Sequence, residues 1–546
     1  MRPWWLVLPL LAARAFAQSS CPTVPTWSSC DFVFDLEPNE DAGHVELRAE
    51  FRSPRHRTFL MYAFADSERR RVIRFSPTEA GDWTYRITSN LPRLDGKEMR
   101  FSALESESPG FVRVANVHHF AYEGTNKGHL WMATGLDHFV EMPRTEFDRG
   151  VDARVKEKFT HLRVTLDAKT ELREAAERVR AINTKGLVAD IVLASIPEDR
   201  EKREEYVGDI VARFGGMNVT WMGVPAFEDV AHGKAILKET GALIKRLDGF
   251  NHPRTTLASA TSAPMLGDEW MTMIDYGTPD PNIGAVEHQL YQAPGINTGI
   301  KNERDLWNAT MNGQYPASGA GGYMTAWFDF MSGNRFWELE PYFDVNGGRA
   351  VALEGIEYIV YVEKPSGPIE VTLERHGYDV AWVNPVNGES TKEKGYNGEH
   401  FTGEAPDRSH PWVLHISREG TKEGMLKSWK FESRPVPVQE VEQAPEKTPF
   451  DVATPAEGTV SISRSPYYAI KIKRDTRATR SLWIEWTGEV VIDGEGYRVV
   501  GAGKEGTMQI PKSIVKNYPA VLSLRMNVLN ANGKAYVVDK VYRLTP

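Results

Sequence analysis

The stretch that decides the fold spans residues 161–193 and reads HLRVTLDAKTELREAAERVRAINTKGLVADIVL. Its two ends, 161–166 and 187–193, are short and apolar, so we predict that both are buried strands. The charged, amphipathic segment 171–185 between them is predicted to be a helix. A strand, a helix and a second strand in this order are typical of a βα unit, whose strands are parallel. The centre of the chain is therefore predicted to contain a parallel sheet.

The same alternation of strand-like and helix-like segments continues on both sides of this stretch. Further strands are predicted at 130–133, 219–222, 254–258, 273–276, 283–287 and 322–327. Eight strands with intervening helices over residues 123–345 fit a (β/α)8 TIM barrel. In such a barrel the active site lies at the carboxyl ends of the strands, so the residues that follow each strand are the candidates for chemistry.

The segments on either side of this barrel have a different pattern. Residues 31–122, 349–418 and 456–546 contain short alternating segments, with Pro and Gly in the turns, which predicts a β-sandwich in each. The Pro- and Glu-rich segment 435–455 is predicted to be an extended linker. The expected fold class is multidomain, α/β plus all-β, with an N-terminal β-sandwich, a central barrel and C-terminal sandwiches.

The first residues predict export. Residues 1–17 read MRPWWLVLPLLAARAFA, a basic start, an apolar run and a small-residue end, which is the layout of a signal peptide cleaved near Ala17. The protein is then expected to be periplasmic or extracellular. Lipid attachment at Cys21 is the minor alternative, because no apolar residue lies three positions before it. Neither this apolar run nor a later one has the length of a transmembrane helix.

Composition excludes some classes of partner and cofactor. The two cysteines, Cys21 and Cys30, are expected to form a disulfide after export. The net charge is −9, with acidic and basic residues interspersed, so no nucleic acid is expected as a partner. No zinc, phosphate-binding or nucleophile-elbow motif occurs, so we predict no metal and no cofactor. The 15 Trp and 19 Tyr are interpreted as core residues or as platforms for sugar rings.

Two stretches resemble known families. Residues 74–85, RFSPTEAGDWTY, resemble the DUF5060 domain, an N-terminal β-sandwich that precedes barrels in bacterial polysaccharide-degrading enzymes. Segments 355–361, 383–389 and 411–414 are similar to a collagen-binding-type sandwich that follows apiosidase-like (DUF4038) barrels. The resemblance implies a secreted glycoside hydrolase-like protein with a polysaccharide or oligosaccharide as its substrate.

The same resemblance implies where a catalytic pair belongs. Glycoside hydrolysis uses two carboxyl groups on either side of the scissile bond, and in the large retaining clan they follow strands four and seven. Glu287 ends the predicted seventh strand and is expected to be the nucleophile or base. After the fourth strand the family's acid is missing, and the first carboxylates are Glu228 and Asp229. We favour Glu228 as the acid, since its side chain is longer and its ordinary pKa is higher.

Other residues at the expected strand ends are candidates for binding substrate. These are Asp137, His138, Arg163, Trp221, His288, Gln289, Tyr291, Tyr323 and Trp327. Arg163 can instead form a buried ion pair with Asp167, and the aromatic residues can instead fill the barrel. The leading functional hypothesis is hydrolysis of O-glycosidic bonds by two carboxylates. The rival hypothesis is a degenerate barrel that serves as a carbohydrate-binding or surface-adhesion protein.

Overall fold

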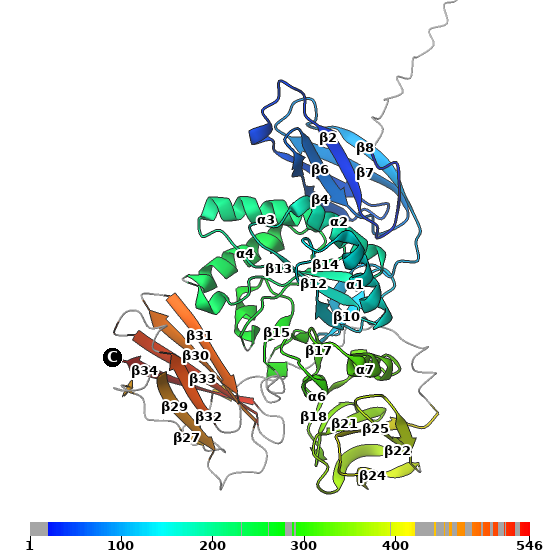
Figure 1. Ribbon diagram of the computed structural model, residues 1–546, viewed down its shortest axis with the longest axis vertical. Coiled ribbons are helices and arrows are strands. Elements are labelled where there is room, and N and C mark those ends of the chain that lie inside the picture. Colours follow the sequence, from blue (N-terminus) through cyan, green and yellow to red (C-terminus); the bar gives the residue numbers. More distant parts are fainter. Residues whose placement is uncertain are drawn as a thin grey trace, which may run out of the picture. The chain divides into compact units, whose positions relative to one another are not determined.

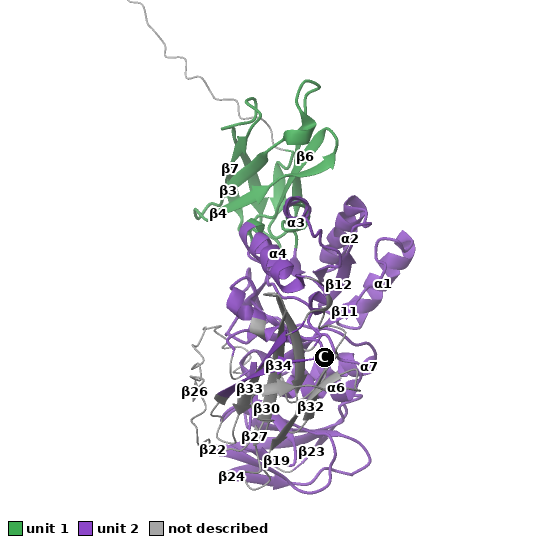
Figure 2. Ribbon diagram, turned by 90° about the vertical axis from the view of Figure 1, so that its left-hand side faces the viewer, with its two compact units in different colours: residues 1–108, 209–217, 247–250 green, residues 109–208, 218–246, 251–546 purple. Residues whose placement is uncertain are grey.

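The computed structural model describes residues 20–420 except 231, 260, 279–286, 289–290 and 394, together with strands between residues 442 and 545. The chain forms two compact units (Figure 2). Unit 1 comprises residues 1–108, 209–217 and 247–250, and unit 2 comprises residues 109–208, 218–246 and 251–546. The predicted signal peptide, residues 1–17, lies outside the described part.

Unit 1 contains two sheets. The larger has the order β1 (Thr23–Pro25), β8 (Glu98–Leu104), β7 (Gly81–Ser89), β3 (Leu47–Arg52) and β4 (Thr58–Tyr62). The smaller has the order β2 (Cys30–Asp35), β6 (Arg70–Phe75) and β5 (Phe64–Ser67), and a 3-10 turn covers Ala42–His44. Side chains alternate between buried and exposed along β3 and β7, as expected for strands with one face against a core.

The core of unit 1 is aromatic and draws on both sheets. Phe51 stacks on Phe75 with ring centroids 4.1 Å apart, and Phe32 and Phe101 pack edge-on against Phe51. Segment 209–217 is held by polar contacts. Arg74 donates to the Arg213 carbonyl at 2.8 Å, and the Ser76 hydroxyl donates to the Gly216 carbonyl at 2.8 Å.

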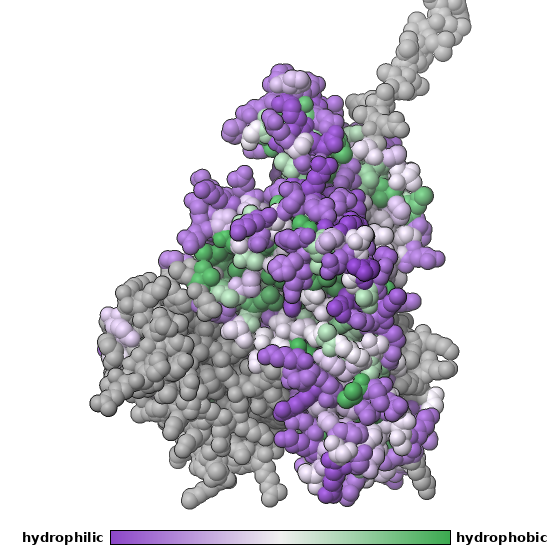
Figure 3. Space-filling model, viewed as in Figure 1, coloured by the Kyte–Doolittle hydropathy of each residue, from purple (hydrophilic) through white to green (hydrophobic). Residues whose placement is uncertain are grey.

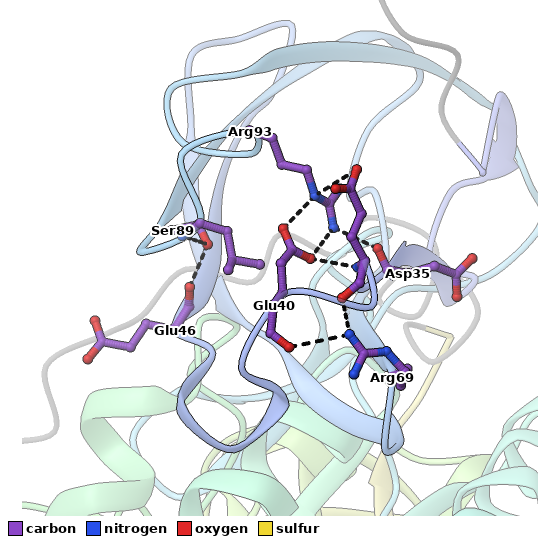
Figure 4. Close-up of polar contacts among 8 residues, drawn as sticks. Asp35, Glu40, Glu46, Arg69, Ser89 and Arg93 are labelled. Atoms are coloured by element: carbon purple, nitrogen blue, oxygen red, sulfur yellow. Dashed lines mark hydrogen bonds and ion pairs between the residues drawn. The ribbon is translucent and has the colours of Figure 1, made fainter.

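Polar side chains fix the long loop of unit 1 between β2 and β3 (Figure 4). Arg93 donates to both carboxylate oxygens of Glu40, at 2.6 and 2.7 Å, and to the Asp35 carbonyl at 2.7 Å. The hydrogen bonds from Arg93 lower the pKa of Glu40 to about 2. Ser89 donates to the Glu46 carbonyl at 2.8 Å, which holds the end of the loop. A disulfide joins Cys21 to Cys30 beside β2.

Unit 2 begins with the hairpin β9 (Val112–Ala115) and β10 (His119–Tyr122) and continues with parallel strands. One sheet has the order β11 (Ala133–Gly135), β12 (His161–Leu166), β13 (Val188–Leu193) and β14 (Val219–Trp221). A second has the order β15 (Ile274–Tyr276), β16 (Gly295–Asn297) and β17 (Gln314–Pro316). Arg254 forms one parallel bridge with Trp221, so segment 254–258 lies next to β14.

Helices follow most of these strands and occupy the cyan-to-green part of the chain in Figure 1. They are α1 (Arg144–Lys156), α2 (Leu172–Thr184), α3 (Arg200–Phe214), α4 (Gly233–Leu247), α6 (Glu303–Met311) and α7 (Gly322–Ser332). Shorter 3-10 turns cover Phe227–Asp229, Ala263–Asp268 and Phe336–Glu338. The mixed α/β fold with parallel strands is as predicted, and closure into an eight-stranded barrel stays a prediction.

The seventh and eighth strands were predicted wrongly. Of the predicted seventh strand, residues 283–286 lie outside the described part, and Glu287 has helical backbone, as does His288. The strand that pairs with β15 is β16, formed by Gly295–Asn297. The segment predicted as the eighth strand is α7, whose buried residues Met324, Trp327 and Met331 have helical spacing. The strand paired with β16 is instead β17, Gln314–Pro316. Short strands of three residues give too little alternation to be recognised in the sequence.

A buried polar network links β12, β13 and the segment before β11. His129 Nε2 contacts His161 Nε2 at 2.8 Å, and His161 Nδ1 contacts Asp190 at 2.7 Å. Trp131 stacks on the His161 ring with centroids 3.6 Å apart. Because Asp190 can only accept when ionised, His161 donates from Nδ1 and accepts from His129 at Nε2. Burial lowers the pKa of His129 well below its usual range, which keeps this ring neutral.

The rest of unit 2 is β structure. One sheet is built from β18 (Glu340–Tyr342), β19 (Val345–Asn346), β20 (Arg349–Leu353), β21 (Glu357–Val362), β22 (Ile369–Val383), β23 (Ser390–Lys392), β24 (Tyr396–Gly403) and β25 (Trp412–Arg418). Further strands are β26 (Glu442–Gln443), β27 (Val452–Ala453), β28 (Gly458–Val460), β29 (Tyr467–Arg474), β30 (Trp483–Ile492), β31 (Glu495–Ala502), β32 (Gly506–Pro511), β33 (Ala520–Leu529) and β34 (Ala535–Leu544). Because β26 and β27 pair with β34 and β29, part of the predicted linker 435–455 forms strands.

Most tryptophans in the described part are core residues. Trp83, Trp131, Trp221, Trp270, Trp307, Trp327 and Trp382 are all less than 2% exposed. Figure 3 shows a mainly hydrophilic face, and exposed large apolar side chains such as Leu104 and Val386 come from separate segments. The tryptophan content of these residues thus reflects packing. Among the described residues, no helix has the length and apolarity needed to cross a membrane.

Candidate functional site

Charged side chains gather where the parallel strands of unit 2 end. Arg163, on β12, donates from Nη1 to the carbonyl of Ala317, directly after β17, at 3.0 Å. Arg163 Nη2 and Asp137 Oδ1 each lie 3.7 Å from the position that a Cβ on Gly135 would occupy. Gly135 ends β11, so Asp137 and Arg163 share the carboxyl edge of the sheet. Asp137 and His138 are exposed to solvent there.

Asp275 is the buried acid of this edge. It lies in β15 between Ile274 and Tyr276, whose side chains pack together on one face, so Asp275 points to the opposite face. Thr298 donates to one carboxyl oxygen at 2.9 Å, and the backbone N–H of Ala258 donates to the other at 3.2 Å. Burial raises the pKa of Asp275 to about 7, although these hydrogen bonds and the Arg163 charge oppose the shift.

Glu228 lies close to Asp275. Its Oε1 accepts from the backbone N–H of Ser259 at 2.9 Å and from the Ser259 hydroxyl at 3.1 Å, and the Glu228 side chain is half-buried. Ala258 and Ser259 are consecutive, so their amide nitrogens are less than ~4 Å apart, which puts the two carboxyl groups within ~10 Å. The Glu228 charge also contributes to the raised pKa of Asp275. The side chain of Asp229 lies outside the described part.

The strand that pairs with β15 supplies no carboxylate to this edge. After Ile296 the chain reads Asn-Thr-Gly-Ile at 297–300, where Asn297 donates to Gln314 and Thr298 contacts Asp275. The expectation that Glu287 ends this strand is therefore wrong. A connection between parallel strands must return to their amino ends, and Glu287 lies on that connection.

The surroundings of Glu287 agree with this placement. Its carboxylate is buried and accepts a hydrogen bond from the Thr261 hydroxyl. Thr261 forms a bridge with Tyr276, whose side chain packs with Ile274 and Ala293 on the face of β15 opposite to Asp275. Glu287 thus packs behind the strand, away from the side that carries Asp275.

His288 belongs to a separate cluster of histidines around Glu340. His288 Nε2 contacts Glu340 directly, His118 Nδ1 lies 3.1 Å from Glu340 Oε2, and His119 Nε2 lies 3.4 Å from Glu340 Oε1. Burial is the main reason why the pKa of His288 falls to about 4. A Cβ on Gly313 would lie 2.6 Å from the His288 ring, and Gly313 directly precedes β17. The cluster therefore lies near the amino end of β17, whereas Asp137 and Arg163 share the carboxyl edge of the sheet, and substrate binding by His288 stays a prediction.

The other residues expected to bind substrate differ in burial. Trp221 and Trp327 are buried, and Trp327 donates to Thr310 at 2.9 Å, so neither ring has a free face for a sugar. Tyr291 and Tyr323 are half-buried, and Gln289 lies outside the described residues. The alternative partner of Arg163, Asp167, instead accepts hydrogen bonds from Thr170 and from the Lys169 amide.

Sequence reasoning missed Asp275 and the histidine cluster for different reasons. Asp275 stands in the stretch MIDYG, within the predicted strand 273–276. A single acid among the apolar residues of a strand is a local signal that could have indicated a functional residue. His118, His288 and Glu340 are separated by so many residues that no local spacing could reveal the cluster. Only the folded chain brings them together.

Comparison with known proteins identifies the class of fold. A family model described as a domain of unknown function, DUF5060, matches residues 23–90, which confirms that part of the resemblance. Among solved structures, a candidate glycoside hydrolase from Bacteroides vulgatus aligns at a TM-score of 0.61 and 16% identity, over 72% of this chain and 99% of that chain. A family 5 glycoside hydrolase from the same organism aligns at a TM-score of 0.50 and 13% identity, over 59% of this chain and 96% of that chain.

These likenesses establish a glycoside hydrolase-like fold for this chain. At such low identity they describe the fold alone and not the reaction. No curated protein matches the sequence.

Proposed function

We propose that this protein binds a carbohydrate at the carboxyl edge of its parallel strands and that its glycoside hydrolase-like fold has lost the usual catalytic pair. One observation carries this proposal. The strand next to β15 ends at Asn297 and is followed by Thr298, where the fold's catalytic carboxylate is expected. Three polar side chains lie at this edge and offer hydrogen-bond donors and acceptors that suit sugar hydroxyls: Asp137, Arg163 and Glu228.

Asp137 offers the direct test of binding. It is exposed, so its replacement by alanine leaves the packing intact. We expect D137A to weaken binding at least ~10-fold to any oligosaccharide that a glycan array selects, measured by calorimetry, since one lost charged hydrogen bond contributes ~1.5–3 kcal/mol. The matched control is E146A, an exposed acid on α1, which should bind as the wild type does. Equal affinity of D137A and wild type would refute this site.

Hydrolysis is the second candidate function, and a specific observation favours it. Asp275 has a pKa of about 7 and lies within ~10 Å of Glu228, and glycoside hydrolysis uses two carboxyl groups, one of which has a raised pKa. In this hypothesis Asp275 is the proton donor and Glu228 is the second carboxyl group. Against it stands the complete burial of Asp275, which keeps that acid from direct contact with a glycosidic oxygen.

Product release separates the two candidates. Incubation of the bound oligosaccharide and of a glycoside with an activated leaving group, followed by chromatography, should show no product if the protein only binds. If hydrolysis occurs, E228Q should reduce it at least ~1,000-fold, far more than it weakens binding. Cleavage by the wild type that is unchanged in E228Q would exclude this pair. We also propose export of the chain, and a mature protein that starts near Gln18 would support it.

A further inference from the structure

We propose that His118, His288 and Glu340 bind one Zn2+ ion, which joins three segments of unit 2. The atoms that can bind a metal on His118, His288 and Glu340 all lie within 4.8 Å of one another. Imidazole nitrogens and carboxylate oxygens are ligands that Zn2+ prefers.

The hydrogen bonds around His118 favour a cation at this position. His118 Nε2 lies 2.9 Å from the carbonyl oxygen of Tyr291, which can only accept, so Nε2 carries the proton. Nδ1 faces Glu340 Oε2 at 3.1 Å, a contact that needs either a proton or a metal ion between the two atoms. A metal ion in place of that proton would bind both atoms.

His119 is a neighbour of this site that holds the carboxylate. Its Nδ1 contacts the Tyr315 hydroxyl at 2.6 Å, which fixes the ring. Its Nε2 lies 3.4 Å from Glu340 Oε1, so His119 orients the ligand Glu340. It is not one of the three residues whose ligand atoms lie within 4.8 Å of one another.

The spacing and the supporting contacts fit a tetrahedral zinc site. With Zn–N and Zn–O distances of ~2.0–2.1 Å, ligand atoms of a tetrahedron lie ~3.3 Å apart. The separation of His118 Nδ1 from Glu340 Oε2, 3.1 Å, is close to that edge. His288 contacts Glu340 directly and would have to move slightly outward. The Tyr291 carbonyl holds the remote nitrogen of His118, as partners of metal-bound imidazoles commonly do.

Burial and position suggest a structural role. The three histidine side chains are 3–5% exposed, whereas the Glu340 side chain is 34% exposed and leaves a path for the ion. Three protein ligands would leave one position of a tetrahedral zinc ion for water. The ligands come from the β9–β10 hairpin, the connection before β16 and the first residue of β18. The ion would therefore fasten the parallel-strand region to the sheet that starts at β18.

The test is metal binding by the full chain after treatment with a chelator. Elemental analysis and competition with a chromophoric chelator should give one Zn2+ per chain, and zinc should raise the melting temperature by ~5–10 °C at a large excess over Kd. Co2+ in the same site should show the visible absorption of tetrahedral cobalt. H288A and E340Q should each weaken zinc binding more than ~100-fold, since they remove a ligand.

A matched variant separates this site from surface binding. H44A removes a histidine whose side chain is 87% exposed and should keep the stoichiometry and the thermal shift of the wild type. If the cluster is only a hydrogen-bond network, H288A and E340Q will change the melting temperature equally with and without zinc, and the wild type will retain no ion. That result, or zinc binding that persists in both variants, would overturn the proposal.

Discussion

Replacement of the buried acid by its amide, D275N, should change the pH dependence of stability. The pKa of Asp275 is raised from 3.8 to about 7 in the folded protein, a shift of about three units, and each unit corresponds to ~1.4 kcal/mol. Between these pH values the folded state keeps a proton that the unfolded chain releases. The contribution of Asp275 to stability is therefore complete below pH ~4 and is lost as the pH rises through ~7.

The amide side chain in D275N does not titrate, so the comparison isolates this group. The Thr298 hydroxyl donates or accepts, which lets the amide keep both hydrogen bonds of the carboxyl. The stability of D275N relative to the wild type should rise by up to ~4 kcal/mol between pH 4 and pH 8. Any constant offset from repacking cancels in this difference.

Calorimetric unfolding at pH 4, 5, 6, 7 and 8 measures the effect. For a chain of this size, 1 kcal/mol corresponds to ~2 °C in melting temperature, so a relative gain of several degrees is expected at pH 8. D137N serves as the control because Asp137 is exposed. A difference in stability between D275N and wild type that is the same at every pH would refute the raised pKa of Asp275. It would also refute the hypothesis that Asp275 is a proton donor.

Three further substitutions test the packing. F51A should destabilise unit 1 by ~3–5 kcal/mol in denaturant unfolding, since Phe51 is fully buried among aromatic rings, and an unchanged midpoint would contradict this core. G241A should destabilise α4 by ~1–3 kcal/mol or more, because its Cβ would lie 2.1 Å from the buried Trp270 ring, whereas G208A, which meets no atom within 4 Å, should be neutral or stabilising. C30S opens a disulfide with a sequence separation of 9 and should lower thermal stability by ~2–3 kcal/mol, an effect that a reducing agent should reproduce in the wild type.

The sequence was sufficient wherever the pattern was long and local. The apolar runs that became β12 and β13, with an amphipathic helix between them, predicted parallel strands, and the structure pairs them as such. The stretch around Arg74 and Trp83 indicated the DUF5060 domain, which the family model confirms. Periodicity and turn residues are properties of neighbouring amino acids, so they can be read before the chain is folded.

Tertiary structure decided what depends on contacts between distant segments. Strands of three residues, such as β16 and β17, carry no detectable period, so the sequence predicts a strand that ends at Glu287, whose backbone is helical. Burial raises the pKa of Asp275. The sequence does not reveal this shift, because no local pattern determines how deeply a side chain is buried. The histidine cluster around Glu340 likewise forms only because three separate segments meet in the folded chain. The spacing of these residues along the sequence does not indicate that they are neighbours.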